Sequence, residues 1–175
     1  DNQEAYDNMV MAYNIAEHPD VMLPIMICQD GFITSHAVMN MQLLDDLTVK
    51  EFVGERQPVD YLLNPDETFA VGPYAVSDYY MESRKAQAHA MENAKKVILD
   101  VAKKIEKISG RKYGLIEEYK MQDAEYAVVI IGSAAGTTKD AIDRMRANGD
   151  KVGLIKVRSF RPFPGEEIAA SLKKC

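Results

Sequence analysis

Apolar residues recur at three- and four-residue steps near the start of the chain, and this spacing predicts an amphipathic helix from Gln3 to Ile15. Asp1 or Asn2 is available to cap its first turn, and Pro19 ends it. A near-continuous apolar run from Val21 to Cys28 follows, and it predicts a strand buried on both faces. A helix followed by a buried strand indicates an α/β fold.

In the middle of the chain, before residue 48, the apolar residues follow no clear helical or strand period. Thr48 to Val53 predicts one helical turn. Gly54 to Ser77 predicts a long connecting segment, because prolines and a glycine interrupt it at positions 58, 65, 72 and 73. We expect this segment to lie against the protein surface, anchored by Tyr61, Leu62 and Phe69.

The longest helical signal runs from Ser77 to Ile108, where apolar residues mark one face at three- and four-residue steps. Ser77 or Asp78 would cap its start, and Gly110 would end it. The lysines and glutamates between the apolar positions are typical of a solvated face.

The last third of the chain predicts a β-α-β unit. Tyr126 to Ile131 predicts a buried strand, followed by a glycine turn into a helix that ends at Asn148-Gly149. Val152 to Val157 predicts the next parallel strand, reached by a right-handed crossover. A short final helix is expected from Gly165 to Leu172, with Pro164 near its first turn.

Composition narrows the classes of protein. The 175 residues suffice for one domain or two small ones, and no apolar run is long enough to cross a bilayer. A formal net charge of −6 argues against nucleic acid or anionic lipid as partners. Two cysteines, Cys28 and Cys175, give neither a disulfide framework nor metal-ligand spacing, so we expect no metal site and a reduced, cytoplasmic setting. Because the sequence starts at Asp1 and stops directly after a helical pattern, we expect it to be a piece of a longer protein.

The stretch from Leu23 to His36 is the first candidate site, since open α/β sheets bind ligands beyond the carboxyl ends of their strands. Asp30, Thr34, Ser35 and His36 stand at that position. The alternative is that these short polar residues only make a turn and cap the next element. General acid or base chemistry by His36 has little support, because no nucleophile elbow, paired metal ligand or nucleotide motif accompanies it.

The glycine turn after residue 131 is the second candidate. Free amides at a helix start can hold an anion, and the residues concerned are Gly132, Ser133, Gly136 and Thr137. The turn lacks both the third glycine of a dinucleotide fingerprint and the Gly-Lys-Ser/Thr ending of a P-loop. A plain strand-to-helix turn is therefore the favoured interpretation.

The third candidate is the segment from Arg158 to Pro164, in which arginines alternate with phenylalanines. Arginine pairs with carboxylates and stacks on rings, so Arg158, Arg161 and Phe163 could form an interface with an acidic partner. Alternatively, Phe160 and Phe163 fill a core edge while the arginines are solvated.

The order of these elements resembles a known family. Asp30-Gly31-Phe32 with Ser35-His36, followed by a proline-rich linker, a long helix and a β-α-β unit ending in Arg161-Pro162-Phe163-Pro164, is similar to the alpha subunit of pyruvate:ferredoxin oxidoreductases. More broadly, it resembles the 2-oxoacid:ferredoxin oxidoreductases. The resemblance covers essentially the whole chain.

The resemblance implies an α/β fold in three parts. Residues 1–53 would be the end of a thiamine-enzyme pyrimidine-binding-type domain, residues 54–123 a linker with the long helix, and residues 124–175 a truncated transketolase C-terminal-like domain. It implies oxidative decarboxylation of a 2-oxoacid, pyruvate by preference, to an acyl-CoA. The family's catalytic glutamate, threonine and arginine would precede this stretch, so no catalytic residue is assigned and the segment alone is expected to be inactive.

The complete complex would carry thiamine diphosphate with Mg²⁺, 4Fe-4S clusters and coenzyme A, none held wholly by this segment. Its partners would be other oxidoreductase subunits of the beta, gamma and delta type, with ferredoxin as electron acceptor. Residues 30–36 would form a loop near the active site or facing another subunit. Two alternatives stay open: a 2-oxoisovalerate or 2-oxoglutarate oxidoreductase, and a non-enzymatic α/β phosphate-binding or interaction module.

Overall fold

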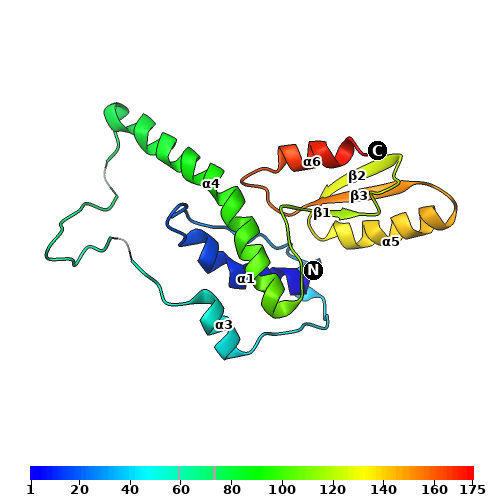
Figure 1. Cartoon of the computed structure of the whole chain (residues 1–175), viewed down its shortest axis with the longest axis horizontal. Coiled ribbons are helices and arrows are strands. Elements are labelled where there is room, and N and C mark those ends of the chain that lie inside the picture. The colour runs from blue at the N-terminus through cyan, green and yellow to red at the C-terminus, as the bar shows by residue number, and fades with distance from the viewer. Residues whose placement is uncertain (59, 73) are drawn as a thin grey trace.

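The structure, a computed structural model, describes residues 1–58, 60–72 and 74–175, so Pro73 of the expected linker lies outside the described residues. It confirms a mixed α/β fold with a helical half and a small sheet half (Figure 1). The helical half contains α1 (Asn2–Ala16), α2 (Ile33–His36), α3 (Asp46–Val53) and α4 (Ser77–Ser109). The sheet half contains β1 (Ile116–Tyr119), β2 (Tyr126–Ile131), α5 (Ala134–Ala147), β3 (Val152–Val157) and α6 (Gly165–Leu172).

The core of the helical half lies between α1 and α4. Helix α1 starts where the Asp1 carboxylate accepts the Glu4 amide at 2.8 Å, as the capping pattern predicts. Its apolar stripe packs on that of α4, with α3 against both, and the buried residues include Val10, Met11, Ile15, Val97, Val101 and Ile105. Helix α4 ends at Gly110, which adopts a left-handed φ of 71° as expected of a C-terminal glycine.

The expected strand from Val21 to Cys28 is wrong. The segment is irregular, and several of its apolar side chains face solvent, Met26 being 86% exposed. The physical reason is the lack of a partner, because the sheet of the described residues consists of β1, β3 and β2 alone. An apolar run folds as a buried strand only where neighbouring strands take up its backbone groups.

The connecting segment before α4 is irregular in its described part, as expected, but it is not anchored to the body. Tyr61, Leu62 and Phe69 are all exposed, and Figure 1 shows the segment swinging away from α1 and α3 before it reaches the tip of α4. The expected cap of α4 is also wrong. Its N-cap is Val76, and no side chain bonds there.

The sheet half confirms the β-α-β unit, with strand order β1-β3-β2 and β2 parallel to β3. Helices α5 and α6 cover opposite faces of the sheet (Figure 1). Because side chains alternate along a strand, Leu154 of β3 packs with Ile142 of α5, whereas the next residue, Ile155, packs on the side of Ile168 of α6. Strand β3 is therefore the central, fully covered strand.

Strand β2 is less buried than expected. Val129 and Ile131 are exposed because β2 is an edge strand of the sheet. The other edge, β1, pairs antiparallel with β3 and was not predicted, since its sequence Ile-Glu-Glu-Tyr is short and polar. β3 itself meets the loop before β2 closely: a Cβ on Gly153 would lie 2.9 Å from the Lys120 carbonyl oxygen.

Candidate functional site

A buried carboxylate on α1 forms the first part of the candidate site. Asp7 is fully buried, and both of its oxygens accept hydrogen bonds from Arg111, at 2.6 Å from Nε and 2.8 Å from Nη2. The Tyr113 hydroxyl donates to the same carboxylate at 2.5 Å. Such bidentate pairing offsets the cost of burying a charge. Burial and the bond to Asp7 raise the pKa of Tyr113 well above its usual range, so it stays a donor.

A second carboxylate, one turn earlier on α1, receives two cations from the end of β3. Arg158 donates from Nε to Glu4 at 2.5 Å, and Lys156 donates to the other oxygen of Glu4. Burial acts to raise the pKa of Glu4, but Lys156 and Arg158 outweigh it and hold that pKa below its usual value. Glu4 is therefore ionised at neutral pH.

Arg158 connects these two parts. Its Nη2 donates to Asn8 at 2.7 Å, its Nη1 donates to the Gly114 carbonyl oxygen at 2.8 Å, and its guanidinium lies 4.3 Å from the centre of the Tyr113 ring. We call these residues the charged junction: Glu4, Asp7, Asn8, Arg111, Tyr113, Lys156 and Arg158. It fixes the helical half against the sheet half through side chains that are mostly more than 100 positions apart.

Sequence reasoning missed the charged junction, apart from Arg158. Asp7 and Glu4 are ordinary polar positions of an amphipathic helix, and no local spacing relates them to Arg111 or Lys156. The alternation of arginines with rings after β3 was the one signal that could have pointed to it. Arg158 was expected at an interface or in solvent; the structure places its side chain, 8% exposed, inside this chain.

Asp30 organises the loop from Asp30 to His36. Its carboxylate accepts the amides of Ile33 and Thr34, at 2.6 and 3.0 Å, and the Thr34 hydroxyl at 2.7 Å. These bonds start the single turn of α2. The Thr34 hydroxyl and amide, with the Ser133 side chain and the Ile33 amide, hold the pKa of Asp30 well below its usual range.

Because the Ser133 side chain is among the groups that lower the pKa of Asp30, the first two candidate segments lie near each other. Ser133 precedes α5, and Gly132 before it has a φ of 87°, which favours glycine. Gly136 and Thr137 lie in the first turn of α5. An ionised carboxylate of the chain itself, that of Asp30, thus lies at the turn where an anion was considered.

The remaining loop residues face outward. Phe32 is 83% exposed and stacks on the His36 ring at 5.8 Å, and His36 Nδ1 lies 2.7 Å from the Ser35 hydroxyl. Gly31 has no neighbour within 4 Å of a Cβ position. This outer face offers an aromatic ring, an imidazole and a hydroxyl to whatever lies against it.

The third segment divides into an inner and an outer part. Whereas Arg158 is enclosed, Arg161 and Phe163 are exposed. The Phe163 ring meets Phe160 edge-on at 6.4 Å, and the Ser159 hydroxyl donates to the Pro162 carbonyl oxygen at 2.9 Å. This outer part presents one cation and two rings.

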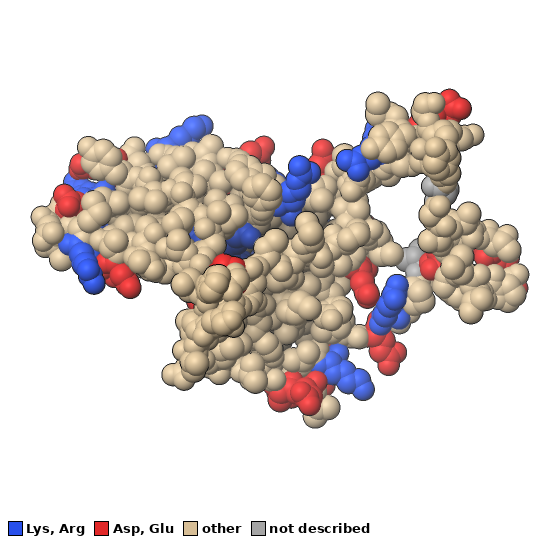
Figure 2. All heavy atoms as spheres, turned by 180° about the vertical axis from the view of Figure 1, so that it is seen from behind, with Lys and Arg blue, Asp and Glu red and all other residues tan. Residues whose placement is uncertain are grey.

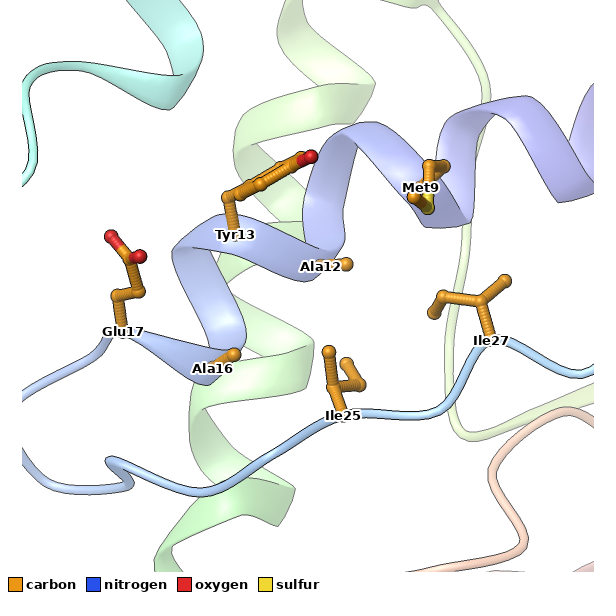
Figure 3. Close-up of a pocket in the computed structure, with 7 residues that line it drawn as sticks. All are labelled: Met9, Ala12, Tyr13, Ala16, Glu17, Ile25 and Ile27. Atoms are coloured by element: carbon orange, nitrogen blue, oxygen red, sulfur yellow. The ribbon is translucent and has the colours of Figure 1, made fainter.

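An apolar groove of about 420 Å³ runs between α1 and the irregular segment after it (Figure 3). Two apolar residues of the stretch from Leu23 to His36 line it, but none of the polar candidate residues above does; its walls are Met9, Ala12, Tyr13, Ala16, Glu17, Ile25 and Ile27. Ile25 and Ile27 face α1 across it, and Glu17 lies at its end (Figure 3). With a single carboxylate and otherwise mostly apolar walls, it supplies contact area but no catalytic pair.

The described residues do not build a site for a diphosphate with its metal ion. In the described ranges, no three His, Cys, Asp or Glu side chains gather closely enough to hold a cation. The glycine turn next to Asp30 carries a negative charge where a diphosphate would need positive groups. We therefore place no step of thiamine chemistry on these residues. No helix within the described ranges has the length and apolar character that a membrane span requires.

Two family models match separate parts of the chain, and the charged junction contains residues from both parts. Residues 1–103 match the family described as pyruvate flavodoxin/ferredoxin oxidoreductase, thiamine diphosphate-binding, and residues 124–175 match pyruvate:ferredoxin oxidoreductase core domain II. Glu4 and Asp7 lie in the first match, and Lys156 and Arg158 lie in the second. Arg111 and Tyr113 come from the segment between them.

Relatives match nearly the whole chain. It is 46% identical to the pyruvate synthase subunit PorA of Thermotoga maritima over 95% of its length, and 45% identical to that of Methanocaldococcus jannaschii over 99%. It is 40% identical, over 98%, to the alpha subunit of an NADH-dependent phenylglyoxylate dehydrogenase of Aromatoleum evansii. The chain spans less than half the length of these relatives, 43%, 45% and 43% respectively. Since the first family match alone covers more than half of it, the chain belongs to the pyruvate flavodoxin/ferredoxin oxidoreductase family.

Proposed function

We propose that this chain is part of the alpha subunit of a pyruvate:ferredoxin oxidoreductase, which converts pyruvate and coenzyme A to acetyl-CoA and CO₂ while reducing ferredoxin. One observation carries the proposal: the identity of 45–46% to subunits named pyruvate synthase extends over nearly the entire chain. Both family matches along the chain support it.

Within that enzyme the chain's own residues serve as scaffold. Thiamine diphosphate supplies the carbanion chemistry when bound, and the protein positions it. We propose the division into residues 1–53, 54–123 and 124–175, with the charged junction fixing the first part to the third through Glu4, Lys156 and Arg158. The loop from Asp30 to His36 belongs to the first part, and the turn at Ser133, whose side chain helps to lower the pKa of Asp30, belongs to the third.

Further cofactors and partners follow from the same proposal. The assembled enzyme would contain 4Fe-4S clusters and bind coenzyme A, with other subunits of the beta, gamma and delta type and ferredoxin as acceptor, in the cytoplasm. We place the loop from Asp30 to His36 beside the active site or against a neighbouring subunit, because its outer face is exposed. Arg161 and Phe163 are exposed in the same way and suit an interface.

Substrate profiling of the intact enzyme tests the activity. With coenzyme A and viologen as electron acceptor, pyruvate should give the highest kcat/KM among pyruvate, 2-oxoisovalerate, 2-oxoglutarate and phenylglyoxylate. A preference for one of the other three acids would keep the scaffold and overturn the narrower function. If none of the four acids supports viologen reduction, the alternative of a non-enzymatic binding module would be favoured.

A matched pair of substitutions tests the loop. Asp30 and Asp45 both bond to the first turn of the helix that follows, α2 or α3, each accepting a backbone amide and the hydroxyl of a following threonine. Asp30→Ala in the assembled enzyme should lower viologen reduction or subunit retention, whereas Asp45→Ala should leave both unchanged. Equal behaviour of the two variants would remove Asp30 from the site.

A further inference from the structure

The segment leading into α4 stands away from the body and exposes large apolar side chains. We define the arm as residues 60–72 and 74–82. It exposes ten such residues, among them Leu63 at 89% and Tyr74 at 91%, and the others are Tyr61, Leu62, Phe69, Val71, Val76, Tyr79, Tyr80 and Met81. Figure 2 shows open space between this part of the molecule and the body. Soluble monomers rarely expose so many large apolar side chains together.

The arm's own bonds are local. The backbone amide of Asn64 donates to the Tyr61 carbonyl oxygen, and the Asn64 side-chain oxygen accepts the backbone amide of Asp66. The backbone amides of Tyr79 and Tyr80 both donate to the Val76 carbonyl oxygen. Each of these bonds joins residues at most four positions apart, so they fix turns and not the position of the arm. Long irregular segments within compact proteins are usually functional or linkers, because ordering them costs conformational entropy.

The arm also carries most of the chain's net charge. It contains five carboxylates, Asp60, Asp66, Glu67, Asp78 and Glu82, and no lysine or arginine. The rest of the sequence holds 22 acidic and 21 basic residues, so it is close to neutral. Acidic side chains interleaved with aromatic rings suit an apolar groove that has lysines and arginines along its edges.

The area is of the size that a stable interface needs. An aromatic side chain buries about 150–250 Å² when covered, so the five partly exposed aromatic residues alone offer on the order of 500 Å². The leucines, valines and methionine add to this and bring the arm near the roughly 800 Å² per partner of a standard interface.

We infer that the arm is a docking surface for a different subunit of the same enzyme, which receives it in an apolar groove edged by lysine and arginine. This rests on the proposed function, since it requires a multi-subunit oxidoreductase. Charge favours a different subunit over a second copy of this chain. Two arms would repel each other, and the near-neutral remainder of the chain has no excess of cations to offer.

Charge reversal within the intact alpha subunit tests the inference. The arm variant is Asp66→Lys with Glu67→Lys, and the control is Glu92→Lys with Asp150→Lys, which changes charge equally at exposed positions outside the arm. The other subunits are co-purified through a tag on the alpha subunit, at increasing salt. Retention should fall at least tenfold for the arm variant and stay at the wild-type level for the control. The uncharged variant Leu63→Ser with Tyr74→Ser should also lose retention, which separates loss of contact from charge effects on folding.

Amide hydrogen exchange gives a second measurement. Residues 60–72 should exchange fast in the isolated, full-length alpha subunit and slowly in the complex. Wild-type retention by both arm variants, or unchanged exchange on assembly, overturns the inference. Protection of the arm that rises with the concentration of the isolated alpha subunit identifies a second copy as the occupant and also overturns it. If the wild-type subunit retains no other subunit at all, the proposed function fails, and this inference fails with it.

Discussion

The charged junction and the arm both contain carboxylates and tyrosine hydroxyls, yet the surroundings of these groups are opposite. In the junction, Asp7 and Glu4 are paired with cations of the same chain, and the Tyr113 hydroxyl is bonded. In the arm, the five carboxylates have no cation in their own stretch of sequence, and Tyr74 faces solvent. The same residue types therefore complete the fold in one region and leave a surface to be covered in the other.

The difference identifies which contacts hold this chain together. A paired, buried charge contributes only while its partner remains, so the junction should be sensitive to single substitutions. Solvated side chains make few contacts in the isolated chain, so single substitutions in the arm should leave the free energy of unfolding nearly unchanged. Substitutions matched between the two kinds of surroundings test this directly.

The largest effect is expected for Arg158→Met, which keeps an unbranched side chain but removes the guanidinium. It leaves Glu4 with Lys156 alone and removes the donors to Asn8 and the Gly114 carbonyl oxygen. Breaking a buried pair in this way should lower the free energy of unfolding by about 3–5 kcal/mol, measured by urea denaturation. Arg161→Met, in the same segment but exposed, should change it by less than about 0.5 kcal/mol. Similar losses in the two variants would contradict the comparison.

The next effect concerns Tyr113, which is half-buried against the core of the helical half. Tyr113→Phe removes the hydroxyl that donates to Asp7 at 2.5 Å and keeps the ring under Arg158. Because a bond to a charged acceptor is lost inside the protein, the free energy of unfolding should fall by about 1.5–3 kcal/mol. Tyr74→Phe in the arm, where the hydroxyl is solvated, serves as the control and should have no measurable effect. A lower free energy of unfolding for Tyr74→Phe would show that the arm is packed against the rest of the protein in solution.

A smaller effect is expected from packing in the sheet half. A Cβ on Gly153 would meet the Lys120 carbonyl oxygen at 2.9 Å and the Ala124 Cβ at 3.0 Å. Gly153→Ala should therefore destabilise by about 1–3 kcal/mol through overpacking. Gly136→Ala in α5 meets nothing within 4 Å and should stabilise by about 0.5–1 kcal/mol, since alanine favours a helix. Thermal unfolding of both variants measures these changes in stability. A change of the same sign in the two variants would contradict the prediction.

Local signals predicted the elements whose partners are close in sequence. The strand from Val152 to Val157 and the helix before it follow from apolar spacing and from Asn148-Gly149, all within about 30 residues of one β-α-β unit. The helix from Ser77 was equally clear, because one apolar stripe marks most of its length. The family resemblance, confirmed by the two matches, added the order of the parts.

The predictions that failed concern structure that depends on residues far away in the sequence, or on a neighbouring strand that the described residues do not contain. The run from Val21 to Cys28 has the composition of a buried strand, but burial requires a neighbouring strand, which composition cannot supply. Strand β1 is polar and short, and it forms because β3 offers an open edge about 40 residues later. The charged junction was hidden for the same reason: nothing around Glu4 indicates a partner at Arg158.

The smallest effect tests a charge that is neither in the junction nor in the arm. Asp30 is half-buried, and the Thr34 hydroxyl and the amides of α2 hold its pKa well below the usual range. A lowered pKa keeps this cap ionised at and above the ordinary aspartate pKa, and the cap is lost only as pH falls below that value toward the lowered one. The Ile33 and Thr34 amides should therefore keep their slow exchange from neutral pH down to about pH 4, the ordinary aspartate pKa. Asp30→Asn should speed exchange at these two amides without moving the urea midpoint, and Asp45→Asn should do so at Thr48 alone. A shifted midpoint for Asp30→Asn would mean that the contact between Asp30 and Ser133 helps to hold the two halves together, as the charged junction does.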